Sequence, residues 1–277
     1  MPNGIVVSCL KKIRSKQPWL VLSAARKFSV INSNHPAISH FYSFEKSSLT
    51  QETMTIPDGC IDIVFDCDMS RPKADVFGTQ MSATDICLEG EHRYFGVRFT
   101  PSVIPHCLKV SAAELVEHHF SLQDVIPHAD QLFEAVVGET DVAAQVAAFQ
   151  QFFDHQHIRQ FSSLTQAVVR LTRERQGNIR IDELANLTGY STRTIQRQFR
   201  ADMGMSPKDF GRVIRCQTAV YMINHHHQVT FSDIAFDLGF SDQPHFLKEF
   251  KKLVSATPKS YQRLVKQQTY LGRIESF

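Results

Sequence analysis

The sequence lacks the short patterns that mark common catalytic sites. Its 277 residues contain no phosphate-binding glycine loop, no Gly-x-Ser-x-Gly nucleophile turn and no His-Glu-x-x-His zinc pattern. Enzymes that depend on one of these motifs for nucleotide binding, acyl transfer or zinc hydrolysis are therefore not indicated.

Cysteine is sparse, and the cysteines are not arranged as ligands. No Cys-x-x-Cys pair occurs among Cys9, Cys60, Cys67, Cys87, Cys107 and Cys216. Lys11 and Lys12 are not followed by a sustained apolar run with a cleavage site, so a secretory segment is not indicated. We therefore expect a reduced, cytoplasmic chain that does not enter a membrane. A redox sensor at Cys60 and Cys67 is one interpretation, and packing as small apolar side chains is the favoured one.

Histidine also fails to form a ligand array. His225–His227 follow a predicted helix, where a solvated loop explains them as well as a metal does. His118 and His119 are adjacent, so on a helix they would point about 100° apart. Neither group has the spacing of a zinc site. We expect no metal and no cofactor.

Charge is divided between the two halves of the chain. Residues 159–277 contain 18 Lys and Arg against 10 Asp and Glu, a net charge of +8, whereas residues 1–158 contain 12 against 18, a net charge of −6. A basic half attracts a phosphate backbone, and an acidic half is repelled by it. An uneven scatter of surface charge is the alternative.

One pattern occurs twice in the basic half. At an offset of 50, Ala185, Gly189 and Ser191 return as Ala235, Gly239 and Ser241; at 51, Phe199 and Pro207 return as Phe250 and Pro258. Each copy predicts a helix, a tight turn and a second helix. The glycine ends the first helix in a left-handed conformation, and Ser191 or Ser241-Asp242 caps the second. This spacing is typical of a helix-turn-helix.

The second helix of each copy leaves a polar face outward. Ile195 and Phe199 face inward in the first copy, and Phe246 and Phe250 in the second. The outward side chains are Arg193, Gln196, Arg197 and Arg200, then Gln243, His245, Lys248, Lys251 and Lys252. Arg, Gln and Lys on an exposed helix can contact base edges and phosphates in a major groove. A plain helical bundle with solvated faces is the alternative interpretation. The presence of two copies of the motif argues against this alternative.

The duplicated region resembles the AraC/XylS family of transcription regulators. The resemblance rests on Gly239 to Phe246, Phe250 to Lys252, Thr257-Pro258 and Tyr261, and on Leu184-Ala185 to Pro207 with Arg215 and Ala219. It covers about residues 165–265. It implies an all-helical DNA-binding domain with two helix-turn-helix units joined by a linker helix, here about Pro207 to Asn224.

The same resemblance implies roles for the outward residues. The base-contacting candidates are Arg193, Gln196, Arg197, Gln243, His245 and Lys248, and we expect Arg200, Lys251 and Lys252 to contact phosphates. Two residues depart from the family pattern, which usually has Ser at Pro244 and Gly at Ser255. Proline is tolerated in a first helical turn, whereas Ser255 predicts a strained or shifted helix end.

The N-terminal half has the character of short strands. Phe41–Phe44, Ile61–Phe65, Val76–Gly78 and Tyr94–Phe99 alternate or run apolar between Gly and Pro turns. Ile56–Phe65 and Gly96–Phe99 also resemble the sensory domain of one branch of AraC-like regulators, which implies a cupin-like β barrel or sandwich followed by helices. The fold class is then α+β with two domains.

The expected domain boundaries follow from these patterns. We expect an unstructured leader over residues 1–25, a sensory or dimerisation domain over 26–155, the DNA-binding domain over 165–265 and a C-terminal tail over 266–277. Residues 150–163 are the predicted linker.

A Phe-rich helical segment is predicted from about Ala112. It is interpreted as either a dimer interface or a layer packed on its own β domain. Asp58, Asp62 and Asp66 are spaced by four, which in a strand places Asp62 and Asp66 on one face. We expect an exposed polar sheet face or a lining for a cationic ligand.

These observations predict a transcriptional regulator rather than an enzyme. The expected partners are double-stranded DNA, a small-molecule effector, a second copy of the chain and, for an activator, RNA polymerase. An enzyme or a redox or metal sensor fused to a helix-turn-helix module is the alternative, and as an enzyme it would require a pocket with perturbed carboxylates in residues 40–110. A scaffold without DNA affinity would require the outward Arg, Gln and Lys side chains to be covered by the N-terminal half.

Overall fold

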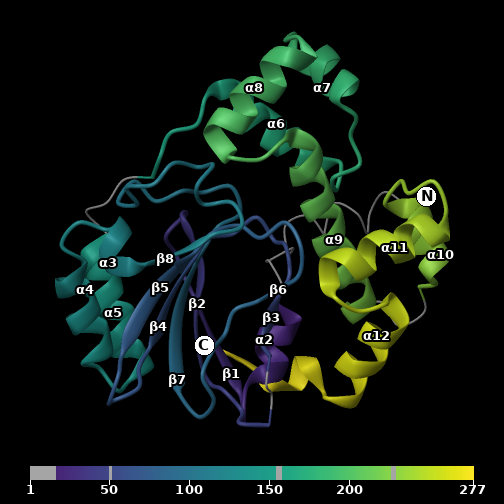
Figure 1. Cartoon of the computed structure of the whole chain (residues 1–277). Coiled ribbons are helices and arrows are strands. Elements are labelled where there is room, and N and C mark those ends of the chain that lie inside the picture. The colour runs from purple at the N-terminus through teal and green to yellow at the C-terminus, as the bar shows by residue number, and fades with distance from the viewer. Residues whose placement is uncertain (1–16, 50–51, 154–157, 226–228) are drawn as a thin grey trace.

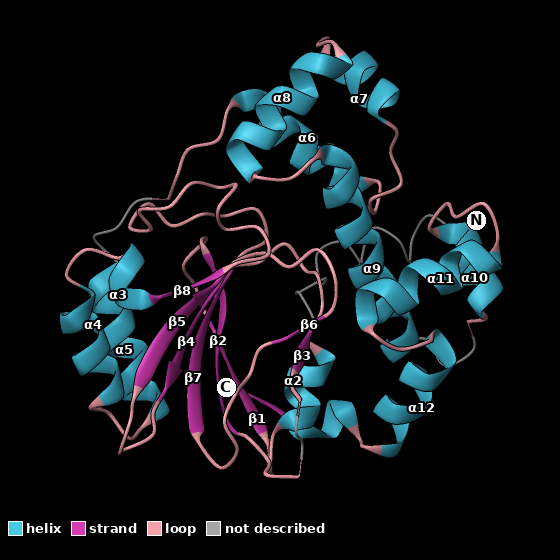
Figure 2. Ribbon diagram, viewed as in Figure 1, coloured by secondary structure: helices cyan, strands magenta, loops and turns pink. Residues whose placement is uncertain are grey.

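The computed structural model describes residues 17–49, 52–153, 158–225 and 229–277. A strand-rich N-terminal region is followed by helices arranged around one long helix, as Figures 1 and 2 show. The predicted two-domain α+β fold class is confirmed. No helix in the described ranges is both long and apolar enough to cross a membrane.

The N-terminal strands form one open sheet. Its spatial order is β8 (His119–Ser121), β5 (Lys73–Phe77), β4 (Asp62–Asp66), β7 (Arg93–Phe99), β2 (Ile38–Glu45), β1 (Phe28–Asn32) and β9 (Ile274–Ser276). Neighbours are antiparallel except β1 and β9. A separate ladder joins β3 (Met54–Thr55) to β6 (Thr84–Asp85). The four predicted strands coincide with β2, β4, β5 and β7, but the sheet ends at β8 and β9 instead of closing into a barrel.

Alternation along each strand divides the sheet into two buried faces. In β4, Ile63 and Phe65 belong to one hydrophobic core and Val64 to another, as the two-residue period of a strand requires. The first core is completed by α3 (Leu122–Val125), α4 (Ala129–Val137) and α5 (Val142–Phe153). These helices cover one face of the sheet in Figure 1.

The Phe-rich segment therefore packs on its own sheet. Leu132, Val136, Phe149 and Phe153 are all buried in that core, so of the two interpretations this one is confirmed for these side chains. The expected helix does not begin at Ala112. Phe120 of β8 pairs with Val76 in the sheet, and the first helix of this segment, α3, begins at Leu122.

The opposite face of the sheet is covered by α2 (Pro18–Ser23) and by C-terminal helices. Leu20, Tyr42 and Phe44 share a core with Phe246 and Tyr261. The Trp19 indole Nε1 donates to the Val254 carbonyl oxygen at 2.7 Å. The expected unstructured leader is therefore wrong for residues 17–25, because Pro18–Ser23 form α2 and five of these six residues are buried. Residues 1–16 lie outside the described residues.

Among the described residues, seven α-helices build the C-terminal domain. They are α6 (Ser163–Glu174), α7 (Ile181–Thr188), α8 (Thr192–Met203), α9 (Pro207–His225), α10 (Phe231–Asp237), α11 (Gln243–Val254) and α12 (Pro258–Gln267). Helices α6 to α8 and the first turns of α9 enclose a further core that includes Leu184, Ile195, Phe199 and Phe210. The predicted linker helix is α9, one residue longer than expected. His226 and His227 lie outside the described residues, as do residues 154–157 of the predicted linker.

The segment expected as a loose tail joins the sheet instead. After the short helix η1 (Tyr270–Arg273), β9 runs parallel to β1, with Ile274 opposite Phe28 and Ser276 opposite Val30. Main-chain hydrogen bonds from Phe277 N to Val30 O and from Asn32 N to Phe277 O extend this pairing. The end of the basic half is thus an edge strand of the N-terminal sheet.

Candidate nucleic-acid interface

The first helix-turn-helix has the corner that its sequence predicts. Gly189 ends α7 with φ +74°, and its N–H donates to the Ala185 carbonyl at 2.9 Å. Ser191 caps α8, where its Oγ accepts from the Thr194 N–H at 3.2 Å. Glycine adopts this left-handed conformation without the Cβ penalty of other residues, so the chain turns sharply between the two helices.

The second unit repeats the corner. Gly239 has φ +67°, and the Asp242 carboxylate accepts from the His245 N–H at 2.7 Å. Pro244 lies in the first turn of α11 without interrupting it, as expected. Ser255 ends α11 in the left-handed region with φ +62°. The helix end is therefore not shifted, and Ser255 occupies the conformation that glycine would take.

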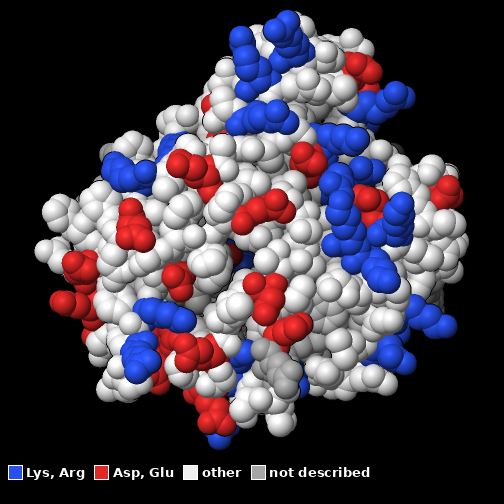
Figure 3. All heavy atoms as spheres, viewed as in Figure 1, with Lys and Arg blue, Asp and Glu red and all other residues white. Residues whose placement is uncertain are grey.

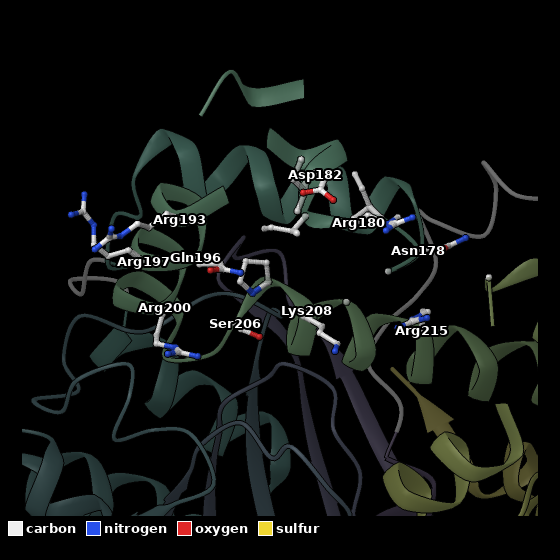
Figure 4. Close-up of a pocket in the computed structure, with 17 residues that line it drawn as sticks. Asn178, Arg180, Asp182, Arg193, Gln196, Arg197, Arg200, Ser206, Lys208 and Arg215 are labelled. Atoms are coloured by element: carbon white, nitrogen blue, oxygen red, sulfur yellow. The ribbon is translucent and has the colours of Figure 1, made fainter. Parts of the chain in front are cut away.

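The outer face of α8 is polar and exposed. Ile195 and Phe199 are buried beneath it, whereas Arg193, Gln196, Arg197 and Arg200 are exposed. These four side chains line a cleft of about 1050 Å³ between α8, the approach to α7 and the start of α9. Figure 4 shows the labelled residues around it. The α8 residues predicted for DNA contact are thus brought together at one site.

The cleft is also lined by positively charged side chains that the sequence analysis did not predict to contact DNA. Arg180, Lys208 and Arg215 line it from the start of α7 and from α9, together with Asp182. Lys208 belongs to the Pro-Lys pair that occurs in both copies of the motif, and this repeat could have identified it as a candidate for DNA contact. The spacing within one helix could not place Arg180 or Arg215, because the fold brings three elements to the cleft.

The outer face of α11 is exposed but partly engaged. His245, Lys248, Lys251 and Lys252 are exposed, and Gln243 is half-buried. The Gln243 Oε1 accepts from the Ser232 hydroxyl at 2.6 Å. The structure does not bring the α11 candidates into the α8 cleft, to which the second unit contributes Gly239 alone.

Three contacts hold the two units together. Arg212 of α9 donates from Nε to the Glu249 carboxylate of α11 at 2.9 Å, and the Arg215 guanidinium lies 4.9 Å from the centre of the Phe240 ring. Gly239 packs so closely on Asn178 that a Cβ there would lie 2.1 Å from the side-chain amide nitrogen. These contacts attach the second unit to α9 and to the segment before α7.

Charge on the surface follows the split in the sequence. On the face shown in Figure 3, lysine and arginine gather over the C-terminal helices at the top and right, while many of the aspartates and glutamates lie over the sheet region. The outward Arg, Gln and Lys side chains are not covered by the N-terminal half. A scaffold that hides this face is therefore not what the chain forms.

The three spaced aspartates are buried rather than exposed. Asp58 and Asp62 flank the Arg98 guanidinium, with oxygen–nitrogen distances of 2.8 Å to each. Burial raises the pKa of Asp62, and the charge of Arg98 opposes that rise. Asp66 accepts from His92 and Tyr94 instead. The expectation of an exposed polar face is wrong, because α2 and the C-terminal helices cover this side of the sheet.

The cysteines give no sign of a reactive site. Cys60 and Cys67 are buried, and burial raises the pKa of the Cys67 thiol. A buried thiol with a raised pKa is poorly reactive, so the Cys67 side chain packs as a small apolar group. Cys9 lies outside the described residues.

Comparison with known proteins places the duplicated motif in a family. Residues 184–264 match a family model described as a helix-turn-helix domain, and residues 35–121 match a domain of unknown function, DUF6597. An uncharacterized HTH-type transcriptional regulator of Haemophilus influenzae is 29% identical over 102 residues, which cover 37% of this chain and 34% of that protein.

Two further proteins resemble the same region. The HTH-type transcriptional activator RhaR of Escherichia coli K12 is 27% identical over 104 residues, 38% of this chain and 36% of that protein. The structure of a probable AraC family transcriptional regulator from Rhodopseudomonas palustris is 26% identical with a TM-score of 0.33, and the match covers 37% of this chain and 97% of that one. The match spans about a third of the length of each curated relative.

The residues that match the helix-turn-helix model include both copies of the motif and both turns, at Gly189 and Gly239. Over residues 184–264, the chain is similar to the helix-turn-helix domains of these transcriptional regulators.

Proposed function

We propose that the protein is a transcriptional regulator that binds specific DNA sequences, with α8 and α11 in two adjacent segments of the major groove. The observation that carries the proposal is the exposed polar face of α8, set in a cleft lined by Arg180, Lys208 and Arg215. Cations around a reading helix bind the phosphates on either side of the groove that the helix enters.

The side chains divide into two roles. Arg193, Gln196 and Arg197 of α8, with Gln243, His245 and Lys248 of α11, are proposed to contact bases, and Arg200, Lys251 and Lys252 to contact phosphates. The α8 side chains carry more of the sequence preference, because Gln243 is already engaged by Ser232. Base contacts specify a sequence, whereas phosphate contacts position the protein on the duplex.

The N-terminal domain is proposed to sense a small molecule or to mediate dimerisation in the cytoplasm. Its core is shared with α11 and α12, so a change in this domain reaches the second reading helix directly. The relative RhaR is named an activator. Were this chain an activator too, RNA polymerase would be a further partner.

An enzyme or a redox or metal sensor fused to a helix-turn-helix module is the alternative. Its best support is the group of buried carboxylates Asp58, Asp62 and Asp66, among which Asp62 has a raised pKa. These carboxylates are held by Arg98, His92 and Tyr94, so they serve as structural ion pairs in the sheet. The regulator is therefore the better supported proposal.

The test is a selection of duplexes from a random pool by the full-length protein. The selected site is then titrated at several salt concentrations, and log K should fall linearly with log salt. Arg193→Ala should weaken binding of the selected site, whereas Arg71→Ala, an exposed arginine of the N-terminal domain, should not. The absence of an enriched site, or equal effects of the two substitutions, would count against the proposal.

A further inference from the structure

A cavity lies between the sheet and the C-terminal segment. It has a volume of about 100 Å³ and is lined on the sheet side by Phe28, Val30, His40, Tyr42 and Arg98. Gln17, Leu20 and Val21 close it from α2, and Tyr270, Ile274 and Ser276 close it from η1 and β9. Both halves of the chain therefore contribute walls to one site.

The Tyr270 hydroxyl at the cavity wall has no hydrogen-bond partner among the described residues. The Tyr270 side chain is 2% exposed, and no described residue forms a hydrogen bond with its hydroxyl. Burial raises the pKa of Tyr270, so the hydroxyl keeps its proton and can donate. The hydroxyl is not fully enclosed by protein, so an acceptor atom that enters the cavity can receive its hydrogen bond.

Arg98 offers further donors at the same wall. A guanidinium has five N–H groups, and Arg98 uses three of them, from Nε and Nη2 to Asp62 and from Nη1 to Asp58. Each carboxylate already accepts three hydrogen bonds, Asp62 from Arg98 twice and from Tyr42, and Asp58 from Arg98, Gln17 and the Cys60 N–H. The groups with the most unused capacity are therefore the donors of Tyr270 and Arg98, which call for an acceptor atom on the ligand.

Charge excludes an anion as that ligand. Two buried carboxylates surround one guanidinium, so the wall of the cavity carries no surplus of positive charge. A ligand carboxylate would add a further negative charge to a buried site, where like charges repel strongly. A cation would have to compete with Arg98 for carboxylates that already accept three hydrogen bonds each. An uncharged molecule with a carbonyl or hydroxyl oxygen satisfies both conditions.

Size limits the ligand as well. The cavity is smaller than the engineered cavity of about 150 Å³ that binds benzene, and it exceeds the share of roughly three waters in liquid water. Apolar side chains of Leu20, Val21 and Ile274 form the rest of the wall. A compact molecule with one polar end and a small apolar body fits this lining.

We propose that this cavity is an effector site for a small uncharged molecule that carries a hydrogen-bond acceptor, held by Tyr270 and Arg98. The assignment rests on the sensing role proposed above and names its ligand class. Because Tyr270, Ile274 and Ser276 follow the second reading unit in the chain, an occupant strengthens the contact between β9 and the sheet. Binding therefore fixes the second unit on the sheet domain.

Acetamide is a suitable probe for the site, with acetate and methylammonium as charged molecules of similar size. Acetamide should bind the full-length protein in the millimolar range expected for so small a molecule, raise the melting temperature with concentration and slow hydrogen exchange at the amides of residues 274–277. Acetate and methylammonium should produce none of these effects. Equal binding of all three, or no binding of acetamide, overturns the proposal.

A pair of tyrosine variants locates the probe. Tyr270→Phe keeps the ring and removes the donor, and should weaken acetamide binding about fivefold, the usual effect of one hydrogen bond. Tyr261→Phe also removes a buried hydroxyl, which donates to Asn224 at 2.9 Å away from the cavity, and should leave acetamide affinity unchanged. The same loss in both variants, or in neither, overturns the assignment.

DNA titration in parallel separates this inference from the proposed function. If acetamide has no effect while a selected duplex binds normally, the effector site is wrong and the DNA-binding role stands. If acetamide binds as described but no duplex is selected, the effector site stands and the DNA-binding role is wrong.

Discussion

Gln217 of the linker helix donates from Nε2 to the Pro57 carbonyl oxygen at 2.9 Å. This bond ties α9, which lies between the two reading units, to the turn that carries Asp58 of the Arg98 cluster. The side chain of Gln217 is 2% exposed. The two halves of the chain are therefore joined by a buried polar contact as well as by the shared core.

Gln217→Leu should destabilise the protein. The substitution leaves a buried carbonyl without this donor, which costs about 1–3 kcal/mol. Urea unfolding of the purified full-length variant measures the loss. Gln267→Leu on the exposed surface of α12 is the matched control and should change stability by no more than about 0.5 kcal/mol. Equal stability of the two variants would show that the contact is not important.

Gly239→Ala should cost more than Gly189→Ala. Both glycines have positive φ, +67° and +74°, and a side chain in that conformation costs roughly 1–2 kcal/mol. A Cβ at Gly189 meets nothing within 4 Å, whereas one at Gly239 collides with Asn178. Thermal unfolding of both variants isolates the packing cost, and identical losses would mean that the two units do not pack at this point.

Arg197→Ala and Lys252→Ala should affect DNA binding in different ways. Loss of a base contact should cost roughly 1–3 kcal/mol and relax the preference at one position of the site. Loss of a phosphate contact should weaken all sequences alike and reduce the salt slope by about one. Titration of both variants against a set of single-base changes distinguishes the roles. Indistinguishable sequence profiles would refute the assignment.

Gln196→Ala should weaken specific binding more than Gln243→Ala. Gln196 is exposed on α8, whereas Gln243 is half-buried and accepts from Ser232 at 2.6 Å. A glutamine must release that bond before both of its amide atoms can pair with adenine. Affinities of the two variants for the selected site provide the comparison. A larger loss at Gln243 would show that the Ser232 contact breaks on binding DNA.

The helical half of the fold was predictable because its signals are local. Gly189, Ser191 and the inward pair Ile195 and Phe199 lie within eleven residues of one another, and the helix period and the caps act over that distance. The same reasoning predicted the tolerance of Pro244, whereas the linker helix α9 was implied by the resemblance to the AraC/XylS family. The left-handed Ser255 was harder to predict, since the surrounding helices hold it in a conformation that its own type disfavours.

The contacts between the halves could not be predicted from local patterns. Ile274 pairs with Phe28 across almost the whole chain, and no spacing rule connects such distant segments. Asp62 and Asp66 were correctly placed on one face of a strand, but strand alternation does not say what covers that face. The burial of both carboxylates depends on α2 and on helices that come some 200 residues later.

The central claim is that α8 and α11 occupy neighbouring segments of one DNA duplex. Hydroxyl-radical footprinting of the full-length protein on its selected site tests this most directly. Two protected windows on the same face of the duplex, about one helical turn or 10 base pairs apart, are the expected result. A single protected window, unchanged by substitutions in α11, would contradict the account.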